Sequence, residues 1–371
     1  MSKKILLLTH EYPPNRGGAG VYCEELAYAA NKKKINLEVW APEGSIKSCN
    51  FDVKKLPWKG THSWVSSWRL VSKLLKLKFQ SESINCIHLA ELGSLRAFVR
   101  FGWRMKNFPQ IIITIHGSEL LKFTANPIEK WLFKKLLHQS VRIHVLSKYN
   151  EEKLKLFCPE IKDKVFRLPG APARRMVPSN QITSYSDSSN FIKILTVGRI
   201  HPRKGQAELL HALNRLPLNL QKQIIITFVG PFAKSTYQRK IEKEKENFNG
   251  KVIFTGDIED HELHKKYQEA DLFALTSTIQ KKSVEGFGFV YLEASAHGLP
   301  ILAHRTGGVE DAVLENKTGL LANPKSIESL AERLETLVSD SKLRDLLGKN
   351  GMEWARSHSW GNIGEKLYNI P

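Results

Sequence analysis

Two carboxylates that lie eight residues apart, Glu285 and Glu293, mark the stretch of this sequence best suited to chemistry. The stretch reads Glu-Gly-Phe-Gly-Phe-Val-Tyr-Leu-Glu, and it follows a strand-like apolar run at 272–276. If Gly288 opens a helix, free backbone N–H groups and the positive end of the helix dipole face an anion. Glu285 would lie at the mouth of such a site, and Glu293 more than one turn inside the helix. The arrangement suits a ligand with a diphosphate in its middle and hydroxyl-rich groups at each end, such as a nucleotide sugar.

Each group in this stretch has an expected role. The Glu285 carboxylate could accept hydrogen bonds from sugar hydroxyls and stabilise an oxocarbenium-like centre. The backbone N–H groups of Phe287, Gly288 and Phe289 would hold sugar hydroxyls and phosphate oxygens. Glu293 could instead be a solvated residue on a helix surface. Its immediate neighbours are apolar, however, which argues against a merely exposed position.

A pair of basic residues follows another predicted strand, at 192–197. The fork of Arg199 and the point charge of Lys204 could neutralise a diphosphate leaving group. A reaction that breaks a sugar–phosphate bond needs such charge, because negative charge builds up on the leaving phosphate. The alternative is a solvated loop of basic residues, which is the role that we expect for Arg203.

Two loops in the first half of the chain also follow predicted strands. Gly17 and Gly18 come after the first strand, where a glycine pair lets a ligand approach the backbone closely. An ordinary strand-to-helix turn is the alternative. His116 ends an apolar run, and a lone histidine at such a place is more often a core residue with satisfied hydrogen bonds. The functional interpretation puts His116 in a binding site, with Glu119 close by and His10 as a weaker candidate.

Four segments resemble motifs of the retaining GT-B glycosyltransferases, of the group 1, family four type. Glu285–Glu293 resembles that family's Glu-x7-Glu motif, and Gly198–Gly205 resembles its Gly-Arg…Lys-Gly phosphate motif. His10–Gly18 resembles its Pro-Pro-x-x-Gly-Gly loop, and Thr114–Glu119 resembles its His-Gly-x-Glu strand end. The motifs occur in the family order and span nearly the whole chain. In detail they look closest to mannosyltransferases that act on phosphatidylinositol mannosides.

The resemblance implies an α/β protein with the GT-B fold, in which two Rossmann-like doubly wound domains face each other across a cleft. The C-terminal domain would bind the nucleotide sugar, and the N-terminal domain would bind the acceptor. By the same resemblance, His116 would contact the reacting sugar and Glu293 the ribose hydroxyls. The backbone of Ile258 would meet the base, and the loop with Gly17 and Gly18 would lie near the diphosphate.

The resemblance also implies retaining transfer of a hexosyl group from a donor of the GDP-mannose or UDP-glucose type. The acceptor would be a hydroxyl of a glycan or a lipid-linked molecule, in the synthesis of cell-envelope glycans or glycolipids such as lipopolysaccharide. Front-face attack would let the leaving phosphate help to deprotonate the acceptor hydroxyl. Positively charged side chains would serve the phosphate, so we expect no cofactor and no metal.

The chain has 371 residues, which suggests two domains. Short apolar runs alternate with helical patterns in both halves, as is typical of doubly wound α/β domains. We predict an N-terminal domain at 1–175, a linker at 176–190, a C-terminal domain at 191–355, and a final helix at 356–371 that crosses back to the N-terminal domain. The expected strands are 5–8, 37–40, 84–88, 111–115, 141–146, 192–197, 224–229, 252–255, 272–276, 300–303 and 319–321. The expected helical segments include 21–31, 120–139, 330–347 and 354–368.

Positive charge is concentrated in the first half of the chain. Residues 1–170 carry 29 Lys and Arg against 14 Asp and Glu, whereas the remainder carries 27 against 23. The basic half must meet something anionic: membrane lipid, a phosphorylated acceptor or nucleic acid. The stretch 64–79, with Trp64 and Trp68 among basic residues, and the basic aromatic cluster at 96–106 favour an anionic membrane surface. Packing of the 64–79 helix on the domain's own sheet is the commoner alternative.

The cysteines are far apart in the sequence and form no Cys-x-x-Cys pair, so we expect reduced thiols in a cytosolic protein. We see no metal-ligand spacing. No apolar run approaches the length of a signal-peptide core or a transmembrane helix. We therefore expect a cytoplasmic protein that is attached at most peripherally to the inner face of the cytoplasmic membrane.

Three other functions stay open. One is a different enzyme on the same fold, such as a sugar-nucleotide epimerase or a phosphorylase, although we find no lysine signature for pyridoxal phosphate. A nucleic-acid-binding protein would explain the charge, but no reading motif is recognisable, and we expect no nucleic-acid partner. The third is a catalytically silent basic binding protein that keeps the fold.

Overall fold

The computed structural model consists of two compact units, each with its own sheet. It describes residues 4–14, 17–46, 51–57, 63–77, 84–105, 109–178, 191–232 and 235–369. The first unit comprises Met1–Gly170 together with Ser359–Pro371, and the second comprises Ala171–His358. The sequence analysis placed these limits at 175 and 355. The predicted linker at 176–190 lies outside the described residues from 179 onwards.

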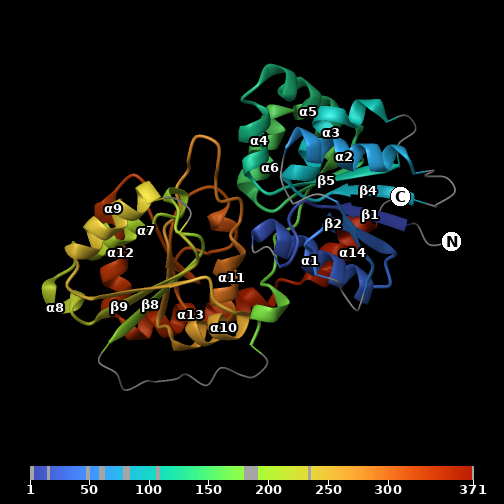
Figure 1. The fold of residues 1–371 in the computed structure, drawn as a ribbon. Coiled ribbons are helices and arrows are strands. Elements are labelled where there is room, and N and C mark those ends of the chain that lie inside the picture. Colours follow the sequence, from blue (N-terminus) through green and yellow to red (C-terminus); the bar gives the residue numbers. More distant parts are fainter. Residues whose placement is uncertain are drawn as a thin grey trace. The chain divides into compact units, whose positions relative to one another are not determined.

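The described part of the first unit is built on a parallel sheet with the strand order β3-β2-β1-β4-β5-β6-β7 (Figure 1). The strands are β1 Lys4–Leu8, β2 Leu37–Pro42, β3 Val53–Leu56, β4 Ile84–Leu89, β5 Gln110–Ile115, β6 Arg142–Val145 and β7 Val165–Arg167. The α-helices are α1 Gly18–Lys32, α2 Trp64–Leu75, α3 Leu92–Phe101, α4 Ser118–Phe123, α5 Pro127–Gln139, α6 Lys148–Phe157 and α14 Trp360–Tyr368. The strand order reverses between β1 and β4, which in doubly wound sheets opens a crevice at the carboxyl ends of the strands.

Aliphatic residues on the strands form the core of this unit. Leu6, Ile87 and Ile113 of the central strands are fully buried, as expected for a parallel sheet that helices cover on both faces. Helix α2 adds Leu70 and Leu74 to the same core. This face of α2 therefore packs inside the unit.

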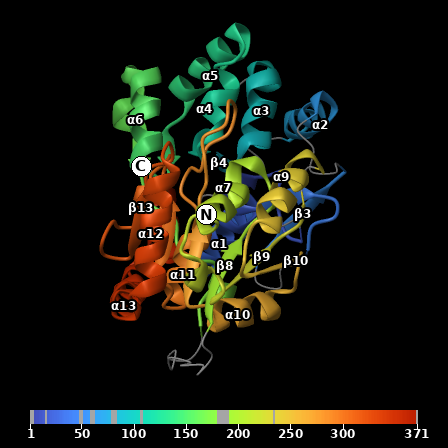
Figure 2. The same cartoon turned by 90° about the vertical axis from the view of Figure 1, so that its left-hand side faces the viewer.

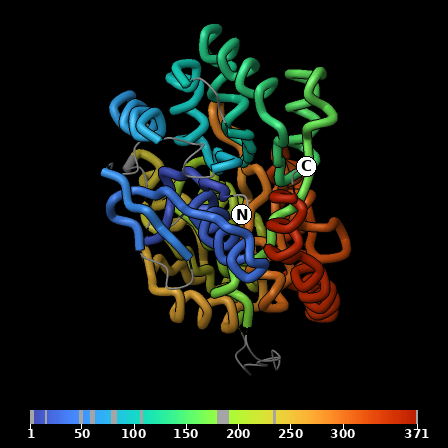
Figure 3. Tube along the Cα trace, turned by 90° about the vertical axis from the view of Figure 1, so that its right-hand side faces the viewer, coloured from blue at the N-terminus to red at the C-terminus, as the bar shows by residue number. Residues whose placement is uncertain are grey.

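The last helix of the chain, α14, belongs to the first unit and packs against α1. Figure 1 shows the two helices side by side, and Figure 3 shows the Cα trace as it ends in α14. Trp360, Ile363 and Leu367 form the buried face of α14. Gly364 lies against Leu26 of α1 and keeps that part of the contact close.

The second unit has a parallel sheet with the order β10-β9-β8-β11-β12-β13 across its described residues (Figures 1 and 2). Its strands are β8 Ile192–Val197, β9 Ile224–Val229, β10 Lys251–Gly256, β11 Leu272–Leu275, β12 Ile301–His304 and β13 Gly319–Ala322. Its α-helices are α7 Gln206–Leu213, α8 Leu218–Gln221, α9 Ser235–Glu246, α10 Asp260–Glu269, α11 Phe289–Ala296, α12 Ile327–Ser339 and α13 Ser341–Arg356. Helix α7 packs against α9 and α12, whereas α11 packs against α13. All six strands predicted for this half of the sequence are present, with shifts of a residue or two at their ends.

The helical segment expected at 120–139 contains two helices, and the prediction of a single helix over 330–347 is wrong, because the structure has two helices there. The first segment divides into α4 and α5, because the Asn126 side chain caps a new helix that begins with Pro127. The second divides between α12 and α13, where the Asp340 side chain accepts a hydrogen bond from the Leu343 N–H.

The helical pattern predicted at 354–368 also spans a break, between the end of α13 at Arg356 and the start of α14 at Trp360. The sequence analysis missed β3 and β7. Both are short edge strands with charged residues, and such strands carry little of the apolar signal of a central strand.

Candidate active site

Three loops of the second unit converge at the carboxyl ends of β8 and β11, the neighbours between which the strand order reverses. The loop after β8 carries Gly198–Gly205, and the loop after β11 carries Ser277. The third loop leads into α11 and carries Glu285. Side chains from all three loops meet at one carboxylate.

That carboxylate belongs to Glu285, which is 8% exposed. Its Oε2 accepts hydrogen bonds from Lys204 Nζ at 2.6 Å, from Arg203 Nη1 at 2.8 Å and from Ser277 Oγ at 3.0 Å. The two cations and the hydroxyl fix the position of the carboxylate. They also link the predicted phosphate motif to the predicted sugar-binding residue.

Burial and pairing together set the charges in this cluster. Burial alone would raise the pKa of Glu285, but Lys204 and Arg203 hold that pKa down to about 2. Burial lowers the pKa of Lys204, and the pairing with Glu285 offsets only part of this effect. Glu285 is therefore ionised at neutral pH, and its charge offsets part of the cost of burying the two cations.

A glycine shapes the entry to α11. Gly288 is the N-cap residue of this helix, with a φ of 89°, and no side chain caps the helix. A Cβ atom on Gly288 would lie 2.5 Å from the Tyr291 ring, so a larger residue does not fit without movement. The positive end of the helix dipole points towards the Glu285 loop. Phe287 and Phe289 are buried, so a ligand would meet their backbone groups rather than their rings.

A second glycine fastens the β8 loop to β11. Gly205 has a φ of 72°, and a Cβ atom there would clash with the carbonyl oxygen of Thr276. The Thr276 hydroxyl donates a hydrogen bond of 2.7 Å to the Gly205 carbonyl. This close approach fixes the position of Lys204, the residue before Gly205, within hydrogen-bond distance of Glu285.

Glu293 lies more than one turn inside α11 and is 6% exposed. Tyr267 Oη donates a hydrogen bond of 3.2 Å to its Oε2, and burial raises the pKa of Glu293 to about 7. The Glu293 carbonyl accepts a hydrogen bond of 2.8 Å from His297 Nδ1. Glu293 is therefore a second buried carboxylate, on the helix whose N-cap residue is Gly288.

Two other residues, Arg199 and Ile258, are also predicted to bind the donor. Arg199 is exposed, its carbonyl accepts a hydrogen bond from Gln206, and its positive charge contributes to the lowered pKa of Lys204. Ile258 is half-buried in the connection between β10 and α10. The donor-binding roles of both residues stay predictions.

In the first unit, Gly17, Gly18 and His116 lie at the carboxyl ends of β1 and β5. Gly17 is the N-cap residue of α1, and Gly18 is the first residue of that helix. His116 Nε2 donates a hydrogen bond of 2.9 Å to the Ala90 carbonyl, and its ring packs edge-on against Tyr22. In the neutral ring this bond places the proton on Nε2 and leaves Nδ1 as an acceptor. The role of His116 beside a sugar stays a prediction.

His10, the weaker candidate, and Glu119 both form hydrogen bonds with other residues of the first unit. Glu119 is buried, and its Oε2 accepts a hydrogen bond of 2.7 Å from the Gly117 N–H. The backbone N–H of His10 donates to Glu91 Oε1 at 3.0 Å, and His10 Nδ1 lies 3.4 Å from the same atom. A role for either residue in a binding site stays a prediction.

A buried polar chain runs through the first unit near His116. His88 Nδ1 lies 2.9 Å from Tyr368 Oη, and His88 Nε2 lies 2.8 Å from Thr114 Oγ1. Tyr22 Oη lies 2.9 Å from both Thr114 Oγ1 and His144 Nδ1. Burial lowers the pKa of His88, and it lowers the pKa of His144 to about 4, so both rings are neutral. This hydrogen-bonded network connects α14 to the sheet through Tyr368 and His88. It was not predicted from the sequence, because its members come from separate elements.

Two partners of Glu285, Arg203 and Ser277, were not predicted from the sequence. We expected Arg203 in solvent, and that prediction is wrong, because its guanidinium is paired with Glu285. Arg203 lies in a 3-10 turn, Pro202–Lys204, which directs it inward. Ser277 follows the end of β11, and that position at the sheet edge was the signal that could have revealed it.

Two family models match the chain. The model "Glycosyltransferase Family 4" matches residues 16–170, and the model "Glycosyl transferases group 1" matches residues 181–354. Each model falls within one of the two compact units. The chain therefore consists of a glycosyltransferase family 4 domain followed by a glycosyltransferase group 1 domain.

Relatives of this glycosyltransferase include mannosyltransferases. The GDP-mannose-dependent alpha-(1-6)-phosphatidylinositol monomannoside mannosyltransferase of Mycobacterium tuberculosis is 23% identical over 377 residues, which cover 98% of this chain and 97% of the relative. The GDP-mannose-dependent monoacylated alpha-(1-6)-phosphatidylinositol monomannoside mannosyltransferase of Corynebacterium glutamicum is 24% identical over 386 residues, which cover 100% of this chain and 98% of the relative.

Solved structures show the same fold for this glycosyltransferase. Sucrose-phosphate synthase from Thermosynechococcus elongatus superposes with a TM-score of 0.79 at 20% identity, over 98% of this chain and 97% of the other. Anabaena HepE in complex with UDP-glucose superposes with a TM-score of 0.75 at 19% identity, over 98% of each chain. These similarities confirm the predicted GT-B fold.

Proposed function

We propose that this glycosyltransferase moves a hexosyl group, with retention of configuration, from a nucleotide-diphosphate sugar to an acceptor hydroxyl. The observation that carries the proposal is the buried Glu285 carboxylate, which Lys204 and Arg203 hold ionised beside the start of α11. A negative group for the sugar and positive groups for the phosphates thus lie within one hydrogen-bonded cluster. Breaking a sugar–phosphate bond requires both kinds of group.

Lys204 is the group that would respond to the donor. Its ammonium is bonded to Glu285, and the lowered Lys204 pKa reflects its burial. A bound diphosphate would bring new negative charge, and Lys204 would turn part of its hydrogen bonding from Glu285 to the phosphate. Glu285 would then have acceptor capacity for the sugar hydroxyls, while Arg203 and Ser277 keep it in place. Arg199, exposed nearby, would add charge at the phosphate.

The proposed course of transfer needs no protein nucleophile. The acceptor hydroxyl would attack the anomeric carbon from the face that the diphosphate leaves. Its proton would pass to the leaving phosphate, so one glycosidic bond forms as the sugar–phosphate bond breaks. Lys204, Arg203 and the α11 dipole would stabilise the departing charge, which is why we propose metal-independent transfer.

The relatives direct the choice of donor. Mannosyltransferases that match the whole chain use GDP-mannose according to their names, so we propose GDP-mannose as the first donor to test. UDP-glucose is the second, because it is bound in a protein of the same fold. Glu293, which is buried and hydrogen-bonded to Tyr267, is the proposed acceptor of hydrogen bonds from the ribose hydroxyls.

We propose a lipid-linked or glycan acceptor in cell-envelope synthesis, presented at an anionic membrane surface. Trp64, Trp68 and Trp103 are exposed on α2 and the turn after α3. The Arg100 guanidinium lies 4.3 Å from the Trp64 ring, and the Arg104 guanidinium lies 5.1 Å from the Trp68 ring. Tryptophans with basic side chains at one surface suit the interface of a membrane. None of the helices in the described parts of the chain is both long and apolar enough to cross a membrane.

The experiment that tests this function is transfer from labelled GDP-mannose and UDP-glucose to extracted lipid and glycan acceptors, with Glu285→Ala and Glu269→Ala side by side. Glu269 is a partly exposed glutamate in a surface ion pair on α10, so its loss controls for a lost carboxylate. We expect product with the donor's anomeric configuration from the parent enzyme and Glu269→Ala, and none from Glu285→Ala. Transfer by Glu285→Ala near the parent rate, or product of inverted configuration, would contradict the proposal.

A further inference from the structure

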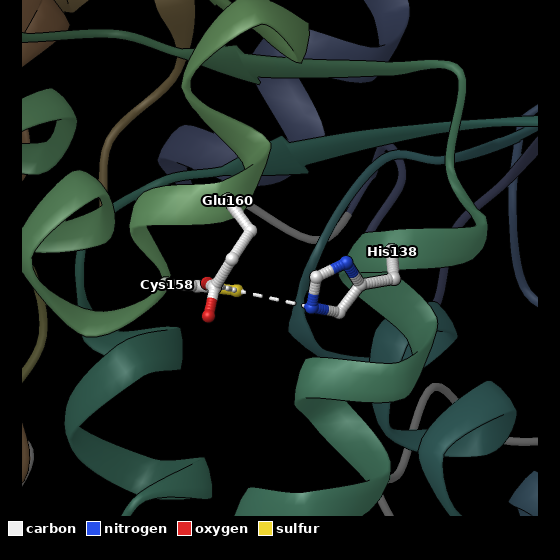
Figure 4. Close-up of side chains that lie close together, drawn as sticks. All are labelled: His138, Cys158 and Glu160. Atoms are coloured by element: carbon white, nitrogen blue, oxygen red, sulfur yellow. Dashed lines mark hydrogen bonds between the residues drawn. The ribbon is translucent and has the colours of Figure 1, made fainter.

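A histidine, a cysteine and a glutamate meet in the first unit, away from the loops discussed above. Figure 4 shows His138, Cys158 and Glu160 with their side chains directed towards one another. One nitrogen, sulfur or oxygen atom from each lies within 4.8 Å of the other two. Cys158 Sγ lies 3.6 Å from His138 Nε2, and it donates a hydrogen bond of 3.3 Å to Glu160 Oε2. We propose that these three residues bind a divalent cation of the Zn²⁺ type, which joins α5 to the end of α6.

The spacing of the three atoms fits a tetrahedral ion. Zinc binds sulfur at about 2.3 Å and nitrogen or oxygen at about 2.0–2.2 Å, so two of its ligand atoms lie about 3.5 Å apart. The two distances from Cys158 Sγ, 3.6 Å and 3.3 Å, are close to this value. Rotation of the His138 and Glu160 side chains towards each other would complete the set, and both residues are exposed and have room to rotate.

The chemistry of the ligands selects the kind of metal. A thiolate and an imidazole favour Zn²⁺ and similar ions, whereas Mg²⁺ and Ca²⁺ prefer an all-oxygen set. On binding, the Cys158 thiol loses its proton to solvent as the sulfur–metal bond forms. The thiolate and the Glu160 carboxylate then balance the two positive charges of the ion, and water fills the fourth position.

The surroundings of these three residues include groups that attract a cation and groups that repel it. His138 lies in the last turn of α5, and Cys158 is the C-cap residue of α6. The carbonyl groups at both helix ends present partial negative charge to the site. Two lysines oppose the ion electrostatically. The charge of Lys134 acts on both Cys158 and Glu160, and Lys164 Nζ lies 2.6 Å from the His138 carbonyl oxygen. The balance predicts an affinity that rises when the Lys164 charge is removed.

The position of the site indicates a structural role. His138 precedes β6, and Cys158 and Glu160 precede β7, so the cluster lies at the amino ends of these strands. The Gly17 and His116 loops follow the carboxyl ends of β1 and β5 at the opposite edge of the same sheet. The ion would therefore stabilise the helix layer without contacting the reacting groups. The sequence shows no signature for this site, because His138 and Cys158 are 20 residues apart.

The test is titration of the full chain with Co²⁺ after treatment with a chelator. We expect a thiolate-to-cobalt charge-transfer band that saturates at one equivalent and disappears when Zn²⁺ is added. Cys158→Ser should abolish the band, and His138→Ala should weaken Co²⁺ binding at least tenfold, by about 1.4 kcal/mol. The matched control is His211→Ala, which breaks a histidine–glutamate contact of 3.1 Å at a place with no cysteine. Lys164→Met should tighten binding.

A second measurement keeps the proposal testable if Cys158→Ser does not fold. Zn²⁺ should raise the thermal unfolding midpoint of the parent and of His211→Ala, and it should raise the midpoints of His138→Ala and Glu160→Gln clearly less, because the loss of a ligand weakens binding to the folded state. Both of these variants change exposed side chains, so the core stays intact. Absence of the band in the parent, or an equal zinc shift in His138→Ala and Glu160→Gln, would overturn the proposal.

Discussion

At the scale of single residues, the ionised Glu285 is the group on which the proposed transfer depends. Its charge is stable only because Lys204 and Arg203 lie within hydrogen-bond distance. The sequence located Glu285 and Lys204 through their spacing after predicted strands, but it could not show that they are bonded to each other. That contact depends on the close approach of the β8 and α11 loops, which is a tertiary feature.

Replacement of the central cation should affect catalysis more than folding. In Lys204→Gln, kcat should fall by about 10²–10³-fold, because a preorganised charge at the leaving phosphate is lost. Arg203 and Ser277 still hold Glu285 in this variant. Steady-state kinetics would measure the effect. The control is Lys222→Gln, which changes an exposed lysine at the C-cap of α8 and should behave like the parent. Equal kcat values for the two variants would be inconsistent with the role of Lys204.

Glu293 predicts a particular dependence of stability on pH. Burial raises the Glu293 pKa to about 7 from an ordinary 4.5, so the folded state holds the proton more tightly than the unfolded state. The stabilising contribution is present below about pH 4.5 and is lost as the pH rises to about 7, by roughly 3 kcal/mol in all. Glu293→Gln has no ionisable group at this position, so residue 293 adds no pH dependence to the stability of the variant.

Denaturant unfolding at several pH values measures this effect. The free energy of unfolding of Glu293→Gln, relative to the parent, should increase between pH 4.5 and pH 7 and stay level above it. Above pH 7, where Glu293 is ionised, the variant should also bind nucleotide more weakly, since an amide replaces a carboxylate that only accepts hydrogen bonds. Parallel pH profiles for the two proteins would show that Glu293 is not the buried acid described here.

At the scale of elements, the turn at Gly288 positions the start of α11. A methyl group at 288 would meet the Tyr291 ring at 2.5 Å, and Tyr291 is itself anchored to the Leu275 carbonyl. We expect Gly288→Ala to cost about 1–3 kcal/mol of stability and to abolish most transfer, because the Glu285 loop must move. Gly256→Ala is the matched control. Its φ of 70° is also left-handed, but nothing lies within 4 Å of the added carbon.

Thermal unfolding and transfer rates of the two glycine variants would separate backbone strain from the loss of site geometry. Both variants should lose some stability, but Gly256→Ala should keep its activity. Full activity in Gly288→Ala would mean that the turn does not position the site.

Sequence periodicity predicted the elements that carry the site better than the elements at the edges. The central strands β8 and β11 are continuous apolar runs, and such runs report burial on both faces of a sheet. The edge strand β3, Val-Lys-Lys-Leu, lacks that pattern and was missed. The break at Asn126 and Pro127 carried a capping signal, but the amphipathic pattern continued through it and hid the boundary.

At the scale of the whole molecule, the excess of basic residues in the first half of the sequence is the feature on which the proposed membrane contact rests. Anionic vesicles should bind the protein at low salt, and neutral vesicles should bind it weakly. Arg104→Glu should reduce binding to anionic vesicles at least fivefold, at about 1 kcal/mol for each basic residue near the surface. Vesicle sedimentation would measure this. Arg356→Glu makes the same charge change on α13 and should have little effect.

If the parent bound neutral and anionic vesicles equally, or if both arginine variants lost the same amount of vesicle binding, the surface formed by Trp64, Trp68 and Trp103 would not be a membrane contact. The charge asymmetry itself was visible in the sequence. The clustering of Arg100 and Arg104 against exposed tryptophans was not, because it requires the packing of α2 on α3.

The most direct test of a nucleotide-sugar site in the second unit is thermal unfolding of the parent and Lys204→Gln with GDP, UDP, ADP and their common sugar conjugates. A ligand at about 100 times its dissociation constant adds about 2.7 kcal/mol of stability. The account predicts that one nucleotide and its sugar conjugate raise the unfolding midpoint of the parent, with a smaller shift in Lys204→Gln. No shift with any of these ligands, or the same shift in both proteins, would contradict it.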